Sequence, residues 1–292
     1  MKSQPYIDCH THAHFAAFKD DYKEVIERAL DNSVWVVNVG TQIDTSRRAI
    51  EVAHEFPEGV FATIGLHPTH TDKSFHDKQE LALPSEAVAK EEGDNAALEF
   101  TSHGEVFDYD AYKKLAEDPR VVAIGECGLD YFRLNEDSKE KQIQAFRDQI
   151  RLAHDVQKPL MIHCRDAFDD LIKILESETE KLNEKPGIIH FFTGTKEHAE
   201  QLVEMGWYFT FGGVITFTRD YNEAINLIPM EKILSETDAP YVTPAPYRGK
   251  RNEPVYVIEV VKKLAELKGV SEEEMKNQIF ENATKIFNFT VN

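Results

Sequence analysis

Two histidines separated by a single residue, His10 and His12, follow a short apolar segment near the start of the chain. If this segment is a β-strand, both side chains project to the same side, because successive side chains alternate between the faces of a strand. A strand can present two imidazoles to one metal cation in this way. The pair alone is weak evidence, so the rest of the chain decides its meaning.

Four more potential metal ligands occur downstream, and each ends its own apolar run. They are Glu126, His163, His190 and Asp238. Imidazole and carboxylate groups without obligatory thiolates suit Zn, Mn or Mg centres. Six such groups exceed what one tetrahedral ion needs, so we predict a site for two divalent metal ions.

The elements that must position these groups alternate regularly along the 292 residues. Short apolar runs predict strands at residues 6–9, 34–39, 60–65, 121–126, 160–164, 187–191, 207–211 and 233–236. Amphipathic segments predict helices near residues 20–31, 42–56, 111–117, 138–157, 166–182, 196–205, 219–228 and 253–268. Strands that alternate with helices indicate a parallel sheet, and eight such pairs predict a TIM (β/α)8 barrel.

We expect this α/β barrel to be a single domain spanning residues 1–292, with two elaborations. A further C-terminal helix is predicted from Ser271, because Ser271 and Glu274 have the spacing of a capping box. The gap between the third and fourth strands is too long for an ordinary connection, so we predict an insertion at roughly residues 72–118. Residues 86–118 hold ten carboxylates and three lysines, which favours a solvated acidic insertion.

Strand order suggests how the ligands group, because TIM barrels gather their chemistry at the carboxyl ends of the strands. His10, His12 and Asp238 come from the first and eighth strands, which are adjacent in a closed barrel. His163 and His190 come from neighbouring strands five and six, and Glu126 on strand four is expected to bridge the two ions. Two ions about 3.5–4 Å apart can bind both an attacking water and an oxygen of the scissile group.

Cations and one further histidine are candidates for substrate contacts. Arg165 follows His163 by two residues and is expected to face the same barrel mouth. Arg248 lies in a basic loop after strand eight, where barrel enzymes often hold phosphate, and the alternative for this loop is a solvated surface. His67 ends strand three and is either a substrate contact or an ordinary turn residue.

Composition narrows the class of protein. The net charge of −19 argues against a module that binds nucleic acid through its overall charge. Two divalent ions against Glu126 and Asp238 would nevertheless leave the site with about two positive charges. The three cysteines do not indicate a disulfide framework, and no apolar stretch approaches the ~20 residues of a membrane span. The first residues lack a signal-peptide apolar region, so we expect a cytoplasmic protein.

With these residues in place, the chain resembles the TatD family of metal-dependent deoxyribonucleases, within the amidohydrolase-like barrels. The matching blocks are residues 8–12, 65–68, 124–131, 163–167, 190–194, 236–240 and 247–254. The resemblance implies a TIM barrel and two-metal hydrolysis of phosphodiester bonds, typically of DNA from an end. It places the metal ligands on His10, His12, Glu126, His163, His190 and Asp238, the same six that the strand pattern selects.

We therefore predict a metal-dependent deoxyribonuclease, with DNA or another nucleic acid as substrate and no membrane or obligatory protein partner. Asp238 is expected to orient the attacking water or take its proton, together with Glu126, while His67, Arg165 and Arg248 contact the substrate. One alternative is ester or amide hydrolysis, or deacylation of an aminoacyl-nucleic acid, on the same barrel. The other is a binding or scaffold protein that retains a metal site.

Overall fold

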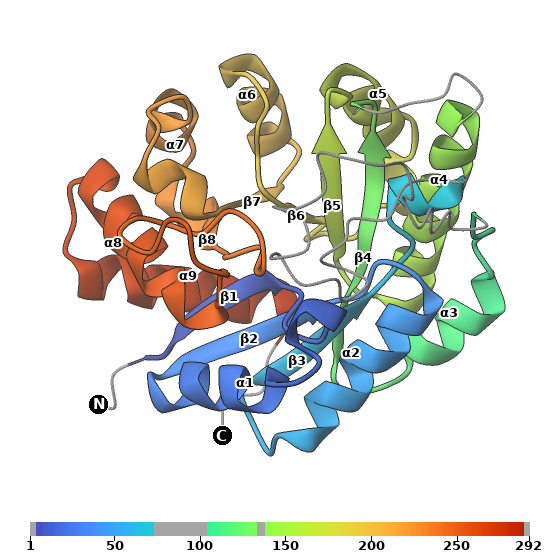
Figure 1. Cartoon of the computed structure of the whole chain (residues 1–292). Coiled ribbons are helices and arrows are strands. Elements are labelled where there is room, and N and C mark those ends of the chain that lie inside the picture. The colour runs from blue at the N-terminus through green and yellow to red at the C-terminus, as the bar shows by residue number, and fades with distance from the viewer. Residues whose placement is uncertain (1–3, 73–103, 133–137, 289–292) are drawn as a thin grey trace, which may run out of the picture.

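A computed structural model describes residues 4–72, 104–132 and 138–288 (Figure 1). Eight parallel strands form one sheet in which the spatial order follows the chain order from β1 to β8. The strands are β1 (Tyr6–Thr11), β2 (Val34–Val39), β3 (Val60–Ile64), β4 (Val121–Asp130), β5 (Leu160–Arg165), β6 (Gly187–Ile189), β7 (Tyr208–Phe211) and β8 (Ile233–Ser235). The helices are α1 (Tyr22–Asp31), α2 (Ile43–Glu55), α3 (Tyr109–Ala116), α4 (Ser138–Val156), α5 (Phe168–Ser177), α6 (Lys196–Glu204), α7 (Asn222–Leu227), α8 (Val257–Lys268) and α9 (Glu272–Phe287).

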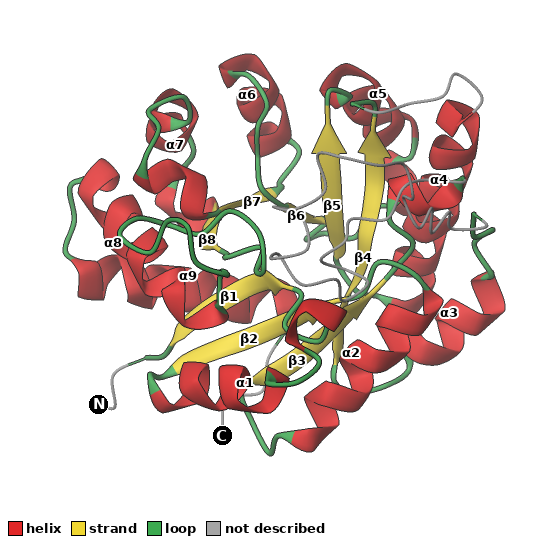
Figure 2. Cartoon of the chain, viewed as in Figure 1, coloured by secondary structure: helices red, strands yellow, loops and turns green. Residues whose placement is uncertain are grey.

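The sheet curves so that its first and last strands meet. Just beyond β8, the N–H of Asp238 donates to the carbonyl of His10 at 2.9 Å, and the N–H of His12 donates to the carbonyl of Ala239 at 2.8 Å. Helices surround the strands on the outside (Figure 2). The predicted TIM barrel is confirmed, and its closure brings the two candidate ligands of β1 beside the one that follows β8.

The local sequence explains why each unit forms. β2 is apolar at all but one position, which is typical of strands in a parallel sheet that is covered on both faces. α2 then starts with a capping box in which Gln42 and Thr45 satisfy each other's backbone donors. Its buried face repeats at helical spacing through Ala49, Ile50 and Ala53, so this face packs toward the strands.

The ends of β4, β6 and β8 differ from the predicted boundaries at residues of the candidate site. β4 continues four residues beyond 126 to Asp130, whereas β6 ends at Ile189 and β8 ends at Ser235. His190 and Asp238 therefore follow their strands instead of ending them. Asp238 has a φ of +54°, a left-handed conformation that an extended strand does not contain.

The segment predicted as an acidic insertion contains a barrel helix. Residues 73–103 lie outside the described residues, but Tyr109–Ala116 forms α3, which lies beside α4 (Figure 1). The side chain of Asp108 caps this helix, and the Tyr112 hydroxyl donates to Glu105 at 2.7 Å. The end of the segment thus supplies the helix between β3 and β4. Tyr112 on this helix is buried in the core, so the helix packs as part of the barrel.

The predicted C-terminal helix is present as α9 and begins where the sequence indicated. Ser271 is its N-cap, and the Ser271 hydroxyl accepts from the N–H of Glu274 at 3.2 Å. Phe280 of α9 packs edge-on against Trp35, with ring centroids 5.2 Å apart. Within the described part of the chain, no helix is both long and apolar enough to cross a membrane.

Candidate metal centre

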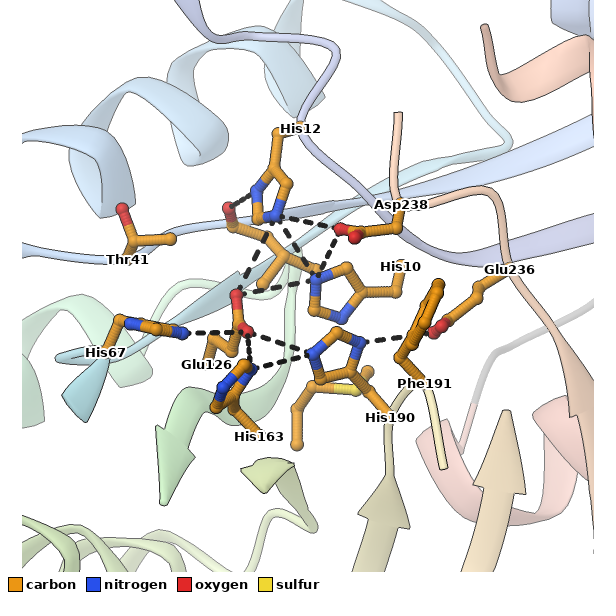
Figure 3. Close-up of polar contacts among 12 residues, drawn as sticks. His10, His12, Thr41, His67, Glu126, His163, His190, Phe191, Glu236 and Asp238 are labelled. Atoms are coloured by element: carbon orange, nitrogen blue, oxygen red, sulfur yellow. Dashed lines mark hydrogen bonds and ion pairs between the residues drawn. The ribbon is translucent and has the colours of Figure 1, made fainter. Parts of the chain in front are cut away.

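The carboxylate of Glu126 lies at the centre of the histidine cluster (Figure 3). Its Oε2 lies 3.5 Å from Nε2 of His10 and 3.7 Å from Nε2 of His12. Its Oε1 lies 3.0 Å from Nδ1 of His163 and 3.0 Å from Nε2 of His190. One oxygen therefore faces the histidines of β1, and the other faces those associated with β5 and β6, which is the arrangement a bridging carboxylate requires.

Asp238 completes the β1 side of the cluster. Its Oδ1 lies 3.4 Å from Nε2 of His12 and 3.7 Å from Nε2 of His10. The Asp238 side chain is 18% exposed, whereas the Glu126 side chain is 5% exposed. Solvent therefore reaches the Asp238 carboxylate more readily than the enclosed Glu126.

The spacing of the ring nitrogens fits divalent cations. Nε2 of His10 and Nε2 of His12 are 3.3 Å apart, and so are Nδ1 of His163 and Nε2 of His190. Two nitrogens that each lie about 2.0–2.1 Å from one tetrahedral ion are separated by about 3.3 Å. Three sets of potential ligand atoms lie within 4.8 Å of one another: His10, Glu126 and His190; His10, His12 and Asp238; and His67, Glu126 and His163.

Backbone carbonyls at and just after the end of β2 accept hydrogen bonds from three of these residues. The carbonyl of residue 39 accepts from Nδ1 of His12 at 2.8 Å. The carbonyl of residue 40 accepts from the backbone N–H of Glu126 at 3.0 Å, and that of residue 41 accepts from the backbone N–H of His67 at 2.8 Å. A carbonyl only accepts, so Nδ1 of His12 carries the proton and Nε2 keeps its lone pair for a cation. One turn of backbone after β2 thereby sets the orientation of groups from three other strands.

Two further carboxylates contact the histidines from outside the cluster. Oδ2 of Asp130 lies 2.9 Å from Nε2 of His163, and Oε2 of Glu236 lies 3.4 Å from Nδ1 of His190. Neither residue is among the six ligands that the strand pattern selects. Four carboxylates therefore surround the centre, and this corrects the expectation that two divalent ions would leave a net positive site.

His67 lies within the cluster, between Glu126 and His163. Its Nε2 is 3.2 Å from Oε1 of Glu126, and its ring meets that of His163 edge-on at 4.4 Å between centroids. Burial lowers the pKa of His67 to about 4, so its imidazole is neutral at pH 7. The sequence left His67 open between a substrate contact and a turn residue, and the structure places it against the central carboxylate.

Two opposing effects set the pKa values of the carboxyl groups in the cluster: burial raises them, and nearby imidazoles lower them. Burial raises the pKa of Glu126, but the imidazoles of His67, His190 and His10 outweigh it and hold that pKa well below its usual value. Burial likewise opposes ionisation of Asp238, whose pKa is nevertheless lowered by the nearby imidazoles of His12 and His10. The centre is thus built to keep carboxylates ionised in a buried place, which requires positive charge beside them.

Two glycines of β4 let the strands at the centre approach closely. A Cβ at Gly125, whose φ is +146°, would lie 2.2 Å from the carbonyl oxygen of Met161. A Cβ at Gly128 would lie 2.1 Å from the carbonyl oxygen of His163. Any larger residue would push β4 away from β5, so these glycines allow Glu126 and His163 to meet.

The cysteines beside the ligands are buried free thiols. Cys9, Cys127 and Cys164 form no disulfide, and none belongs to a candidate ligand group among the described residues. Burial raises the pKa of Cys127 well above its ordinary value, which keeps the thiol neutral. These side chains act as small apolar groups in the core.

The two arginines expected to contact substrate are exposed, and each lies over an exposed aromatic ring. The guanidinium carbon of Arg165, at the end of β5, is 3.5 Å from the ring centroid of Phe132. That of Arg248, in the loop after β8, is 3.9 Å from the ring centroid of Phe217. Both cations thus follow the carboxyl ends of barrel strands, but they stack on rings instead of meeting the central carboxylate.

Comparison with known proteins places this barrel and its histidine cluster in a family. A family model described as TatD-related DNase matches residues 7–288. The chain belongs to the TatD family. A Bacillus subtilis relative, described as an uncharacterized metal-dependent hydrolase, is 37% identical over 284 residues, covering 96% of this chain and 98% of the relative. An Erwinia tasmaniensis relative, named as the 3'-5' ssDNA/RNA exonuclease TatD, is 32% identical over 279 residues, covering 93% of this chain and 95% of the relative.

Solved structures agree with this assignment. The crystal structure of a TatD homologue from Escherichia coli superposes with a TM-score of 0.77 at 25% identity and covers 98% of both chains. A TatD-family hydrolase from Entamoeba histolytica has a TM-score of 0.76 at 22% identity, covering 98% of this chain and 99% of the other, and shows the same fold. This TatD-family protein is therefore a metal-dependent hydrolase with the family's barrel.

Proposed function

We propose that this TatD-family hydrolase cleaves the phosphodiester bonds of DNA, removing nucleotides from an end with the help of two divalent metal ions. The observation that carries the proposal is the Glu126 carboxylate, which lies between two pairs of converging imidazole nitrogens. The family description as DNases, and the name of the Erwinia relative as an exonuclease, support nucleic acid as the substrate class.

The ligands divide between the two halves of the cluster. His10, His12 and Asp238 would hold one ion, His163 and His190 would hold the other, and Glu126 would be shared between them. Mg, Mn and Zn all accept imidazole and carboxylate ligands of this kind. When bound, such ions lower the pKa of an attacking water and stabilise the negative charge that develops on the phosphoryl group.

Asp238 is the residue that takes the proton from the attacking water. Its carboxylate combines contact with His10 and His12 with access to solvent, whereas Glu126 is enclosed by five imidazoles. The left-handed backbone of Asp238 is held by the hydrogen bond from its N–H to the His10 carbonyl. This bond keeps the carboxylate in place over β1, so that proton transfer needs no rearrangement of the chain.

Local cations must attract the substrate, because neither the surface nor the cluster does. The chain carries a net charge of −19, and four carboxylates would balance two divalent ions at the centre. Arg165, at the end of β5, and Arg248, in the loop after β8, are both exposed. These arginines are the groups that bind the phosphates of the incoming strand.

The decisive experiment is digestion of end-labelled single-stranded and duplex DNA by the metal-free protein, with and without added Mg or Mn. Glu126→Ala and Asp238→Asn are the matched inactive controls. Metal-dependent loss of terminal nucleotides, absent in both controls, is the expected result and also gives the polarity of digestion. If metals bind but no DNA or RNA is cleaved, ester, amide and aminoacyl-nucleic-acid substrates replace the phosphodiester. Inactivity on all of these would instead indicate a binding protein.

A further inference from the structure

Two phenylalanines at the barrel mouth have exposed side chains. Within the described residues, the exposed large hydrophobic side chains are Val106, Phe132 at 49% and Phe217 at 46%. Phe132 lies two residues beyond β4, and Phe217 directly follows the 3-10 turn Gly213–Thr216 after β7. Both rings thus lie beyond the carboxyl ends of strands, where barrel enzymes bind their substrates.

Each exposed ring has an arginine over it that comes from the next strand in the sheet. Arg165, at the end of β5, lies over Phe132, and Arg248, after β8, lies over Phe217, at 3.5 and 3.9 Å from the ring centroids. The flat guanidinium stabilises the ring by cation–π contact and remains available to an anion. About half of each phenylalanine's surface stays open even with the arginine in place.

Hydrogen bonds hold the backbone near each phenylalanine. One links Phe132 to a residue that contacts the metal centre, and the other links the residue before Phe217 to the loop after β8. The N–H of Phe132 donates at 3.0 Å to Oδ1 of Asp130, whose other oxygen contacts His163. On the other side, the N–H of Ala245 donates at 2.8 Å to the hydroxyl of Thr216, the residue before Phe217.

Arg248 is held in the same loop after β8, because its Nη1 donates at 3.1 Å to the carbonyl of Thr243. In the sheet, β6 lies between the β4–β5 pair and the β7–β8 pair. The two pairs therefore lie on either side of the strand that His190 follows.

We propose that Phe132 and Phe217 are stacking platforms for unpaired nucleobases, with Arg165 and Arg248 neutralising the phosphates beside them. This inference rests on the proposed nuclease function and specifies which part of the substrate is recognised. An aromatic ring stacks on any base, so it contributes affinity without sequence preference, while the cation beside it meets the backbone. Bases within a duplex are already stacked on their neighbours, so the platforms favour single strands and frayed ends.

The test compares KM and kcat of the metal-loaded enzyme on a single-stranded oligothymidylate and on an abasic strand of the same length. We expect Phe217→Ala and Phe132→Ala each to raise KM for oligothymidylate by roughly tenfold or more while kcat changes little, because one base stack is lost. On the abasic strand both variants should match the wild-type enzyme. Fluorescence anisotropy measures the affinity for oligothymidylate without turnover when each phenylalanine variant is combined with Asp238→Asn. These double variants should bind oligothymidylate more weakly than Asp238→Asn alone.

Matched variants separate stacking from general effects at the surface. Phe217→Trp should retain low KM, whereas Phe217→Leu, which is apolar but lacks a ring system, should behave like the alanine variant. Lys232→Ala is the control for loss of a cation from an aromatic ring, because Lys232 lies 4.2 Å from the Tyr208 ring centroid at the opposite end of β7. This variant should leave KM unchanged.

Two outcomes overturn the inference, and they are distinguishable. If the wild-type enzyme digests DNA but Phe132→Ala and Phe217→Ala leave KM unchanged, or raise it equally on the abasic strand, stacking is wrong while the nuclease function stands. If the wild-type enzyme digests no nucleic acid, the proposed function fails and the platforms fail with it.

Discussion

Asp130 holds His163 from the side opposite the metal centre. Oδ2 of Asp130 lies 2.9 Å from Nε2 of His163, while Nδ1 of the same ring points at Glu126. Because a carboxylate at Nε2 keeps the proton on that nitrogen, Nδ1 presents its lone pair to a cation. The carboxylate also fixes the ring orientation and makes the imidazole a stronger base.

Replacing Asp130 with Asn should therefore weaken metal binding without unfolding the protein. We expect the affinity for Mn or Zn to fall by about 10–100-fold, the usual cost of removing such an outer carboxylate. Isothermal titration of the metal-free protein measures the change directly. Asp169→Asn is the matched control, since Asp169 contacts Nε2 of His198 at 3.1 Å on the exposed surface. Equal affinities for both variants would contradict the role given to Asp130.

Metal binding should also stabilise the fold, because it places positive charge among buried carboxylates. Free metal at 100 times its dissociation constant should add about 2.7 kcal/mol to the free energy of unfolding. Thermal unfolding with chelator and with Mn or Zn tests this as a rise in Tm. In Glu126→Gln, which retains the shape of the side chain but not its charge, the rise should largely disappear. A wild-type Tm that does not respond to metal would contradict a site at this cluster.

The glycine before Glu126 should be irreplaceable for steric reasons. Gly125→Ala would place a Cβ 2.2 Å from the Met161 carbonyl at a φ of +146°, and we expect it to cost about 3 kcal/mol or more. Gly249 also has a positive φ, +84°, but a Cβ there meets nothing within 4 Å, so Gly249→Ala should cost only about 1–2 kcal/mol. Urea unfolding of both variants measures the difference, and equal losses would show that crowding at β4 does not matter.

The barrel and the six proposed ligands could be predicted from the sequence because both follow simple periodic rules. Parallel strands are apolar runs, and a polar group at the end of each run must lie at the barrel mouth. His10 and His12 share a face through alternation, and Glu126 begins the polar end of β4. Chain order then brings β1 and β8 together, which explains why Asp238 could be placed beside His10 although 228 residues separate them.

Asp130 was missed because β4 was taken to stop at its first charged residue. The strand continues to Asp130, and residues four apart in a strand share a face, so alternation alone would have placed Asp130 on the side of Glu126. The contact of His67 with Glu126 depends on the hydrogen bond from its N–H to the carbonyl at position 41. The rings beneath Arg165 and Arg248 depend on loop conformation, which periodicity does not specify.

Two glutamines on the buried face of α4 connect this helix to the centre. Gln142 accepts from the N–H of Asp130 at 2.9 Å and donates to its carbonyl at 3.0 Å. Gln149, two helical turns later, makes the same pair of bonds to Leu66, the residue before His67, at 2.9 and 3.0 Å. The side-chain amide of each glutamine thus satisfies the backbone N–H and carbonyl of one residue beside the cluster, as a neighbouring strand would do.

Gln142→Leu should lower both stability and metal affinity, because it leaves two buried backbone groups of Asp130 without their partner. The expected cost is about 2–4 kcal/mol in the free energy of unfolding, and metal affinity should fall as the Asp130 carboxylate loses its fixed position. Gln144→Leu, on the exposed face of the same helix, should stay within about 0.5 kcal/mol of wild type and bind metal normally. Urea unfolding and metal titration of the pair test both effects. Normal metal affinity in a destabilised Gln142→Leu would show that α4 supports the barrel without positioning Asp130.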